Sequence, residues 1–213
     1  MKDIAIKSIC HKLTKQYNIN LSEAIALDFY AREGDWQTQH YASQVKKIYA
    51  WEIEPQFESQ LKQNLPSSAE IKIGNSFELA SSKENFFDIV VLDNPQGCYG
   101  NKNEYCEHFE SLPLALNLLK ESGGIIVFNV KARPWSYDDK KEWQARRNSF
   151  YNLKDSSSLS EGFIFNFYKD FFHTRGYETV FSFWDKRPQE DGLYAFTVQL
   201  IKQKNEHHQK HNQ

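Results

Sequence analysis

Short apolar runs recur between residue 24 and about residue 131, with amphipathic segments between them. Two of these runs, Ile89–Leu92 and Ile125–Phe128, contain no polar residue. Continuous apolar runs of this length are typical of strands buried on both faces, as in a parallel sheet. The pattern therefore predicts five successive strands, at residues 24–29, 48–53, 70–73, 87–92 and 124–130.

Two segments between these strands have the spacing of helices. Residues 104–120 place Phe109, Leu112, Leu116 and Leu119 on one helical face, and Gly123–Gly124 follows as a stop signal. Residues 55–64 begin with Pro55, which suits the first turn of a helix. Strand–helix alternation of this kind predicts an α/β protein with a doubly wound sheet.

The C-terminal third has a different order of elements. An aromatic-rich helix is expected over residues 161–175, followed by strands at 177–184 and 193–201. The turn residues 188–192 between these strands are too few for a crossover, so the strands should pair as an antiparallel hairpin. The predicted fold is a seven-stranded, mostly parallel sheet that ends in this hairpin.

The domain organisation follows from the same pattern. Residues 1–20 are expected to form an N-terminal helical extension, and residues 21–203 a single domain. A charged, Ser-rich stretch at about 132–160 interrupts the alternation and is interpreted as an insertion after the fifth strand. The polar, His-rich tail 204–213 is expected to be disordered rather than to bind metal, and we predict no metal site.

Composition narrows the class of protein. The 213 residues are 40% hydrophobic and 15% aromatic, which is enough for a sizeable core, and the formal net charge of −2 excludes an overall basic field. The three cysteines are widely spaced and odd in number, so we expect free thiols rather than a disulfide framework. Without a signal peptide or a membrane-length apolar run, the chain is expected to be soluble and cytoplasmic.

Polar segments follow each of the first four predicted strands, at residues 28–35, 52–55, 74–78 and 93–100. In doubly wound sheets, ligands bind at the carboxyl ends of the strands. In this order, the segments resemble the motifs of class I S-adenosylmethionine-dependent methyltransferases, and the terminal hairpin extends the resemblance over most of the chain. The resemblance implies a methyltransferase that uses S-adenosylmethionine.

The first segment corresponds to the family's cofactor loop. Asp28, Tyr30, Ala31 and Gly34 are in register with the motif and would contact the cofactor. Arg32 stands where the family has a glycine, at a position that can require a positive φ. Either Arg32 tolerates the cofactor or the loop has lost it; an ordinary strand-to-helix turn is the other interpretation.

The second and third segments would hold the nucleoside part of the cofactor. The resemblance implies that the Glu52 carboxylate accepts hydrogen bonds from the ribose hydroxyls while Ile53 packs on the adenine. Glu54 is the alternative to Glu52, and the competing interpretation is that either glutamate only opens the next helix. After the third strand, the family's pattern assigns Asn75, Ser76 and Phe77 to the adenine; a simple Asn turn is the competing interpretation.

The fourth segment begins Asp93-Asn94-Pro95-Gln96 and resembles the catalytic motif of nucleic-acid methyltransferases that modify exocyclic amines. The resemblance implies that Asp93, Asn94 and Pro95 orient the target amine, that Asp93 also lies beside the cofactor, and that an aromatic residue stacks on the base. Gln96 replaces the second proline of the motif, and no aromatic residue stands at the expected place, so Tyr99 is the candidate for this role. Cys98 is disfavoured as the nucleophile of a carbon-5 methyltransferase, because Gln96 and Gly97 separate it from Pro95.

Residues 131–154 suggest the nature of the substrate. They hold seven basic and three acidic residues, a net charge of +4, with interleaved aromatic residues. Phosphate pairing and base stacking by such residues favour a nucleic-acid substrate, DNA or RNA. The candidate contacts are Lys131, Arg133, Trp135, Arg146 and Arg147. A solvated helical face, or a lid over a small anionic substrate, are the alternatives.

The sequence thus favours a methyltransferase that acts on a nitrogen of a nucleic-acid base. A small molecule or a protein as acceptor, and a non-catalytic binding or assembly subunit with the same fold, remain alternatives. A dehydrogenase is disfavoured, because the Gly-x-Gly-x-x-Gly signature is absent and the terminal hairpin is unusual for that class. The oligomeric state is left open.

Overall fold

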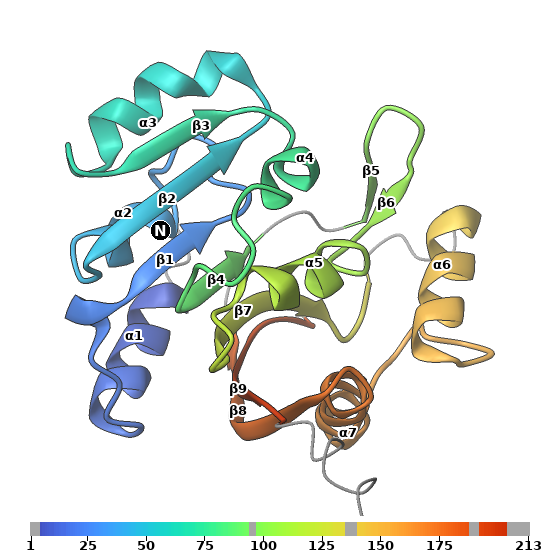
Figure 1. Cartoon of the computed structure of the whole chain (residues 1–213). Helices are drawn as coiled ribbons and strands as arrows, with labels where there is room; N and C mark the ends of the chain where they lie inside the picture. The colour runs from blue at the N-terminus through green and yellow to red at the C-terminus, as the bar shows by residue number, and fades with distance from the viewer. Residues whose placement is uncertain (1–4, 94–96, 135–139, 188–191, 204–213) are drawn as a thin grey trace, which may run out of the picture.

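The computed structural model describes residues 5–93, 97–134, 140–187 and 192–203. Its main sheet has seven strands in the order β3-β2-β1-β4-β7-β9-β8 (Figure 1). Five of them run parallel: β1 (Ile25–Asp28), β2 (Lys47–Glu52), β3 (Glu70–Ile73), β4 (Ile89–Leu92) and β7 (Gly124–Lys131). The prediction of a doubly wound sheet is confirmed.

The C-terminal strands β8 (Tyr177–Lys186) and β9 (Leu193–Lys202) pair antiparallel with each other, and β9 pairs antiparallel with β7. The predicted hairpin is therefore confirmed, with each strand slightly longer than expected. Most of its connecting turn lies outside the described residues. Gly192, the last residue of that turn, has φ +74°, and a Cβ atom there would lie 2.8 Å from Cβ of Arg133. Glycine is thus required where the hairpin passes close to the segment after β7.

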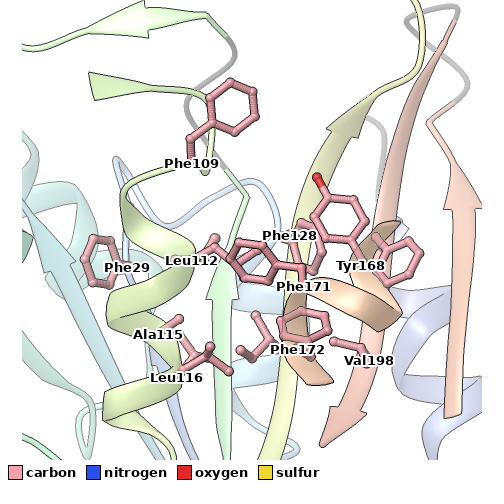
Figure 2. Close-up of a cluster of buried hydrophobic side chains, with 14 of the residues drawn as sticks. Phe29, Phe109, Leu112, Ala115, Leu116, Phe128, Tyr168, Phe171, Phe172 and Val198 are labelled. Carbon is pink, nitrogen blue, oxygen red and sulfur yellow. The ribbon is translucent and has the colours of Figure 1, made fainter. Parts of the chain in front are cut away.

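Helices cover both faces of the sheet. Alternate residues along each central strand point to opposite faces, so each strand contributes to a core cluster on either side. Leu27 and Val90 belong to a core cluster with α5 (Ser111–Leu118) and α7 (Glu161–His173), shown in Figure 2. Ala26 and Val91 belong to a second cluster on the other face. The helices of that second face are α1 (Ala5–Lys15), α2 (Thr38–Ala42) and α3 (Glu58–Asn64).

The remaining elements surround the carboxyl ends of the parallel strands. They are the short helices η2 (Pro55–Phe57) and α4 (Ser76–Ala80), the helix α6 (Lys141–Tyr151), and a separate two-stranded hairpin, whereas the short helix η1 (Leu21–Glu23) precedes β1 at its amino end. The hairpin is formed by β5 (Cys98–Tyr99) and β6 (Tyr105–Cys106) (Figure 1).

The prediction of one helix over residues 104–120 is wrong at its beginning. Residues 105–106 form β6, and the helix starts only at Ser111. Glu107 has φ +47°, in the left-handed region that a right-handed helix cannot pass through. The hairpin and this residue therefore delay the helix. None of the helices in the described part of the chain is long and apolar enough to span a membrane.

Candidate functional site

The loop that follows β1 turns around Asp28, whose carboxylate is buried. Its oxygens accept hydrogen bonds from Thr38 Oγ1 at 2.6 Å, from Tyr41 Oη at 3.1 Å and from the Tyr30 amide at 3.3 Å. Burial raises the pKa of Asp28 to about 6, and the nearby Asp93 adds to the shift, while the hydrogen bonds oppose it. Asp28 thus anchors the loop to α2.

Arg32 occupies the glycine position of the loop with φ +48°, so the backbone adopts the conformation for which glycine is favoured. Its side chain is 52% exposed, lies 3.4 Å from the Glu33 carboxylate, and extends over the ring of Phe57. Gly34 has φ +72°, and a Cβ atom there would lie 3.0 Å from Leu61. The loop therefore keeps the backbone shape of a glycine-rich turn while its arginine faces outward.

A small, open hollow lies against this loop. Residues 30–38 line it together with Asp28 and Asp93. The hollow thus joins the ends of β1 and β4, where the sequence predicted the cofactor and the reacting atoms to meet.

Glu52, at the end of β2, is 5% exposed and connects that strand to the loop. Its Oε2 accepts a hydrogen bond from the Arg32 amide at 2.7 Å, and its Oε1 accepts one from the Glu54 amide at 2.9 Å. Each carboxylate oxygen has a second lone-pair direction, so two further donors can still be accepted. The adjacent Ile53 is 58% exposed and offers an apolar surface beside the carboxylate.

Asn75, Ser76 and Phe77 form the start of α4. Asn75 caps the helix by accepting a hydrogen bond from the Phe77 amide at 3.0 Å, and Ser76 donates to the Phe29 carbonyl at 2.7 Å. Phe77 stacks on Tyr105 of the small hairpin, with ring centroids 4.0 Å apart and an interplanar angle of 11°. One face of Phe77 is therefore covered by Tyr105, a residue that the sequence analysis did not single out.

The same hairpin reaches the loop after β1. Tyr99 and Tyr30 have their hydroxyl oxygens 2.8 Å apart, and the Tyr99 ring packs at 5.2 Å from that of Tyr105. Burial raises the pKa of Tyr30 to about 12 and that of Tyr99 further, so both hydroxyls stay protonated near neutral pH. We call Tyr30, Phe77, Tyr99 and Tyr105 the aromatic wall.

Asp93 follows β4 and forms an ion pair with Arg187, which follows β8; Oδ1 and Nη1 are 2.6 Å apart. Nη1 of Arg187 also lies 3.2 Å from Oδ1 of Asn129, and the guanidinium sits 5.0 Å from the ring centroid of Trp36. Sequence reasoning missed Arg187, Asn129 and Trp36. Asn129 could have been found from the strand pairing. Leu92 of β4 pairs with Phe128 of β7, so the residues that follow them, Asp93 and Asn129, are neighbours.

The other predicted site residues either fall outside the described part of the chain or lie elsewhere in the structure. Asn94, Pro95 and Trp135 lie outside the described residues. Arg146 hydrogen-bonds the Asn103 and Glu104 carbonyls and forms an ion pair with Glu110, which ties α6 to the small hairpin. Arg133 is exposed.

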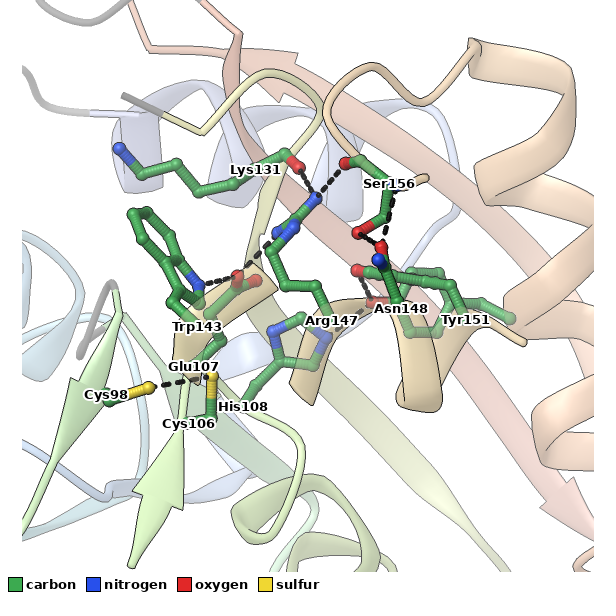
Figure 3. Close-up of polar contacts among 11 residues, drawn as sticks. Cys98, Cys106, Glu107, His108, Lys131, Trp143, Arg147, Asn148, Tyr151 and Ser156 are labelled. Atoms are coloured by element: carbon green, nitrogen blue, oxygen red, sulfur yellow. Dashed lines mark hydrogen bonds and ion pairs between the residues drawn. The ribbon is translucent and has the colours of Figure 1, made fainter. Parts of the chain in front are cut away.

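Arg147 is fully buried and paired with Glu107 (Figure 3). It donates to the Lys131 carbonyl at 2.7 Å, and Trp143 Nε1 donates to the same Glu107 at 2.7 Å. Lys131 is 1% exposed, and burial lowers its pKa to about 8. Neither cation faces solvent in this structure, so Arg147 and Lys131 lie in the interior rather than on a surface open to an external phosphate.

No protein-family model and no curated protein matches the sequence. Solved structures are similar in fold at low identity. The M. jannaschii TYW2 structure in complex with AdoMet has a TM-score of 0.56 at 14% identity, over 92% of this chain and 76% of that one. A Burkholderia thailandensis 1,6-didemethyltoxoflavin-N1-methyltransferase, with its substrate and S-adenosylhomocysteine bound, has a TM-score of 0.57 at 14% identity, over 95% and 80%.

A Pyrococcus horikoshii protein, PH1948, described as an RNA methyltransferase, has a TM-score of 0.54 at 14% identity, over 93% of this chain and 82% of that one. The chain spans only 64% of another Pyrococcus horikoshii protein, PH0793, to which it is similar. With its strand order and terminal hairpin, the chain has the fold of class I S-adenosylmethionine-dependent methyltransferases.

Proposed function

We propose that this protein is an S-adenosylmethionine-dependent methyltransferase that methylates a nitrogen of a planar base, with a nucleic-acid base as the first candidate. The observation that carries the proposal is that the loop after β1, Glu52 and Asp93 lie together at one edge of a sheet with the class I methyltransferase strand order. The structures of TYW2 and of the toxoflavin methyltransferase contain the cofactor or its product on the same fold.

The described residues fit the cofactor. The hollow against residues 30–38 would accept its methionine end, Glu52 its ribose hydroxyls, and the exposed Ile53 its adenine. Asp28, which accepts a hydrogen bond from Thr38, would support the loop, and Asn75, which caps α4, would lie at the adenine edge. When bound, the cofactor supplies a methyl group activated by a sulfonium.

The protein's contribution to the transfer would be mainly positioning, because an activated methyl group needs little acid–base assistance. Asp93, which Arg187 holds at the end of β4, would orient the acceptor amine. Arg187 and Asn129 would hold the Asp93 carboxylate in place. The aromatic wall would supply a stacking surface for a planar acceptor.

Calorimetry with S-adenosylmethionine and S-adenosylhomocysteine tests the proposal directly. Glu52→Gln removes one of two charged acceptors, a loss of about 1.5–3 kcal/mol, and should weaken binding at least about tenfold. Glu54→Gln is the matched control, because Glu54 is exposed and is the alternative acceptor for the ribose hydroxyls. This variant should bind the cofactor as the native protein does. Absence of binding by the native protein at millimolar concentration of either compound would refute the proposal.

Arg32 motivates the alternative of a non-catalytic subunit with a degenerate cofactor loop. Arg32→Gly separates the two, because it keeps the positive φ while it removes the side chain. If Arg32 only replaces glycine, native protein and variant should have similar calorimetric affinities. Binding by the variant alone would favour the degenerate subunit.

A small heteroaromatic acceptor is the second candidate function. It is favoured by the internal use of Arg146 and Arg147, which leaves fewer charges for phosphates than the sequence suggested. Methyl transfer from labelled cofactor to RNA, DNA and free heterocycles would distinguish the two. A nucleic-acid acceptor predicts that Lys141→Glu and Lys154→Glu weaken substrate binding and its salt dependence, whereas a small uncharged acceptor predicts neither change.

A further inference from the structure

The small hairpin places two cysteines directly opposite each other. Cys98 of β5 pairs with Cys106 of β6 in the antiparallel register, and their sulfur atoms lie 3.6 Å apart (Figure 3). Both are free thiols, as the sequence predicted, but eight positions of separation did not suggest that they would meet. The hairpin thus brings two thiols that are separate in the sequence into direct contact.

The backbone geometry of this pair suits a disulfide. Residues directly opposite in an antiparallel ladder have Cα atoms about 4.5–5.5 Å apart, within the roughly 4.4–6.8 Å that a disulfide spans. The two side chains lie on the same side of the hairpin and already face each other. Closing the sulfurs to a bond of about 2.05 Å therefore requires small side-chain rotations rather than movement of a strand.

We propose that Cys98 and Cys106 form a reversible modification site that exchanges with low-molecular-weight disulfides such as oxidised glutathione. The Cys98 thiolate attacks one sulfur of that disulfide, which forms a mixed disulfide and expels one thiolate. The Cys106 thiolate then attacks Cys98 Sγ and expels the second. The two thiol protons go to the two expelled thiolates, so the small disulfide is reduced to two thiols and the protein pair is oxidised.

The exposure of the two residues sets the order of attack. Cys98 is partly exposed, whereas Cys106 is fully buried, so the external disulfide reaches Cys98 first. Burial raises the pKa of both thiols; Arg146 lowers that of Cys98, while the acidic Glu107 and Glu142 oppose this. The exchange should therefore be slow at neutral pH and faster in mild alkali.

The third cysteine is an internal comparison. Cys10 lies on α1 in the core cluster of the opposite sheet face, where no other cysteine of the described residues is buried with it. Burial raises its pKa to about 12. It should neither exchange nor form a disulfide.

The cross-link would act on the aromatic wall. Cys98 precedes Tyr99, whose hydroxyl hydrogen-bonds that of Tyr30. Cys106 follows Tyr105, whose ring stacks on Phe77. A covalent bond between the strands would hold these two rings in one arrangement. This step rests on the proposed function: it predicts that oxidation changes KM for the acceptor more than the affinity for cofactor.

The test is equilibration of the reduced full-length protein with oxidised glutathione in mild alkali, followed by alkylation and peptide mass mapping. The expected product has lost two thiols, links Cys98 to Cys106, keeps Cys10 alkylated, melts at a higher temperature and reverts with dithiothreitol. Cys106→Ser should stop at a glutathione adduct on Cys98, and Cys98→Ser should not react.

Either of two results would overturn the proposal: a native protein that stops at the Cys98 adduct, or one that keeps all three thiols at equilibrium. These readouts do not depend on catalysis. If the disulfide forms but no cofactor binds, the proposed function fails while the modification site stands.

Discussion

At the scale of the residue, Asp28 is a buried carboxyl group whose proton affinity depends on folding. Its pKa of about 6 in the folded protein lies above the ordinary value near 3.9 of an unfolded aspartate. Between these pH values the folded state binds more protons than the unfolded state. Its contribution to stability is therefore complete below about pH 4 and is lost as the pH rises through 6.

Asp28→Asn should remove this pH dependence. The amide is neutral at every pH and can still hydrogen-bond Thr38 and Tyr41. The native protein should lose on the order of 3 kcal/mol between pH 4 and pH 7 through this group, and the variant should not. Urea unfolding across that range measures the difference. Asp170→Asn, at an exposed position, is the control and should keep the pH profile of the native protein. If Asp28→Asn also kept that pH profile, the assignment to Asp28 would be contradicted.

Residues also mark where sequence reasoning reached its limit within the site. Glu52 and Asp93 were identified because each ends a buried strand, and strand ends follow from local pattern. Arg187 was not, because it reaches Asp93 from 94 positions away and depends on how the terminal hairpin packs. A contact of that kind requires the three-dimensional structure, since no local periodicity encodes it.

At the scale of the element, α6 is held to the rest of the protein by a buried ion pair as well as by aromatic side chains in the core. Arg147 of α6 pairs with Glu107, and the Trp143 indole shares the same carboxylate. The sequence shows a basic, aromatic helix here, and that pattern equally suits a substrate-binding surface. In the structure the Arg147 side chain is buried, and its charge is matched by the Glu107 carboxylate from the segment after β6.

Arg147→Met should therefore destabilise the protein strongly. Removing one partner leaves Glu107 buried without its countercharge, which typically costs about 3–5 kcal/mol. Adding Glu107→Met should recover much of this loss, because an apolar pair replaces the buried charges. Denaturant unfolding measures both variants. Lys62→Met, which breaks an exposed pair with Glu58, is the control and should cost well under 1 kcal/mol. An equal cost for both single variants would contradict the buried role.

At the scale of the whole molecule, the sheet topology was predictable and the shape of the site was not. Continuous apolar runs identify central strands, and a short turn between two late strands forces an antiparallel pair. The small hairpin β5–β6 carries only two residues in each strand, too few for any periodicity to appear. Tyr105 and the cysteine pair were missed for that reason, although they border the predicted catalytic segment.

The fold also predicts how the whole molecule should respond to ligand. If S-adenosylhomocysteine binds only the folded state, a concentration of 100 times Kd adds about 2.7 kcal/mol of stability. For a chain of 213 residues this corresponds to a rise in Tm of about 5–10 °C. Because Glu52 joins β2 to the loop after β1, ligand binding should couple the two strands, and a tenfold or greater loss of affinity in Glu52→Gln should remove at least about half of the rise. Calorimetric melting with increasing ligand measures it, and adenosine alone serves as the control for the methionine end. A rise that is unchanged in the Glu52 variant would exclude this carboxylate from the cofactor site and return the role to Glu54.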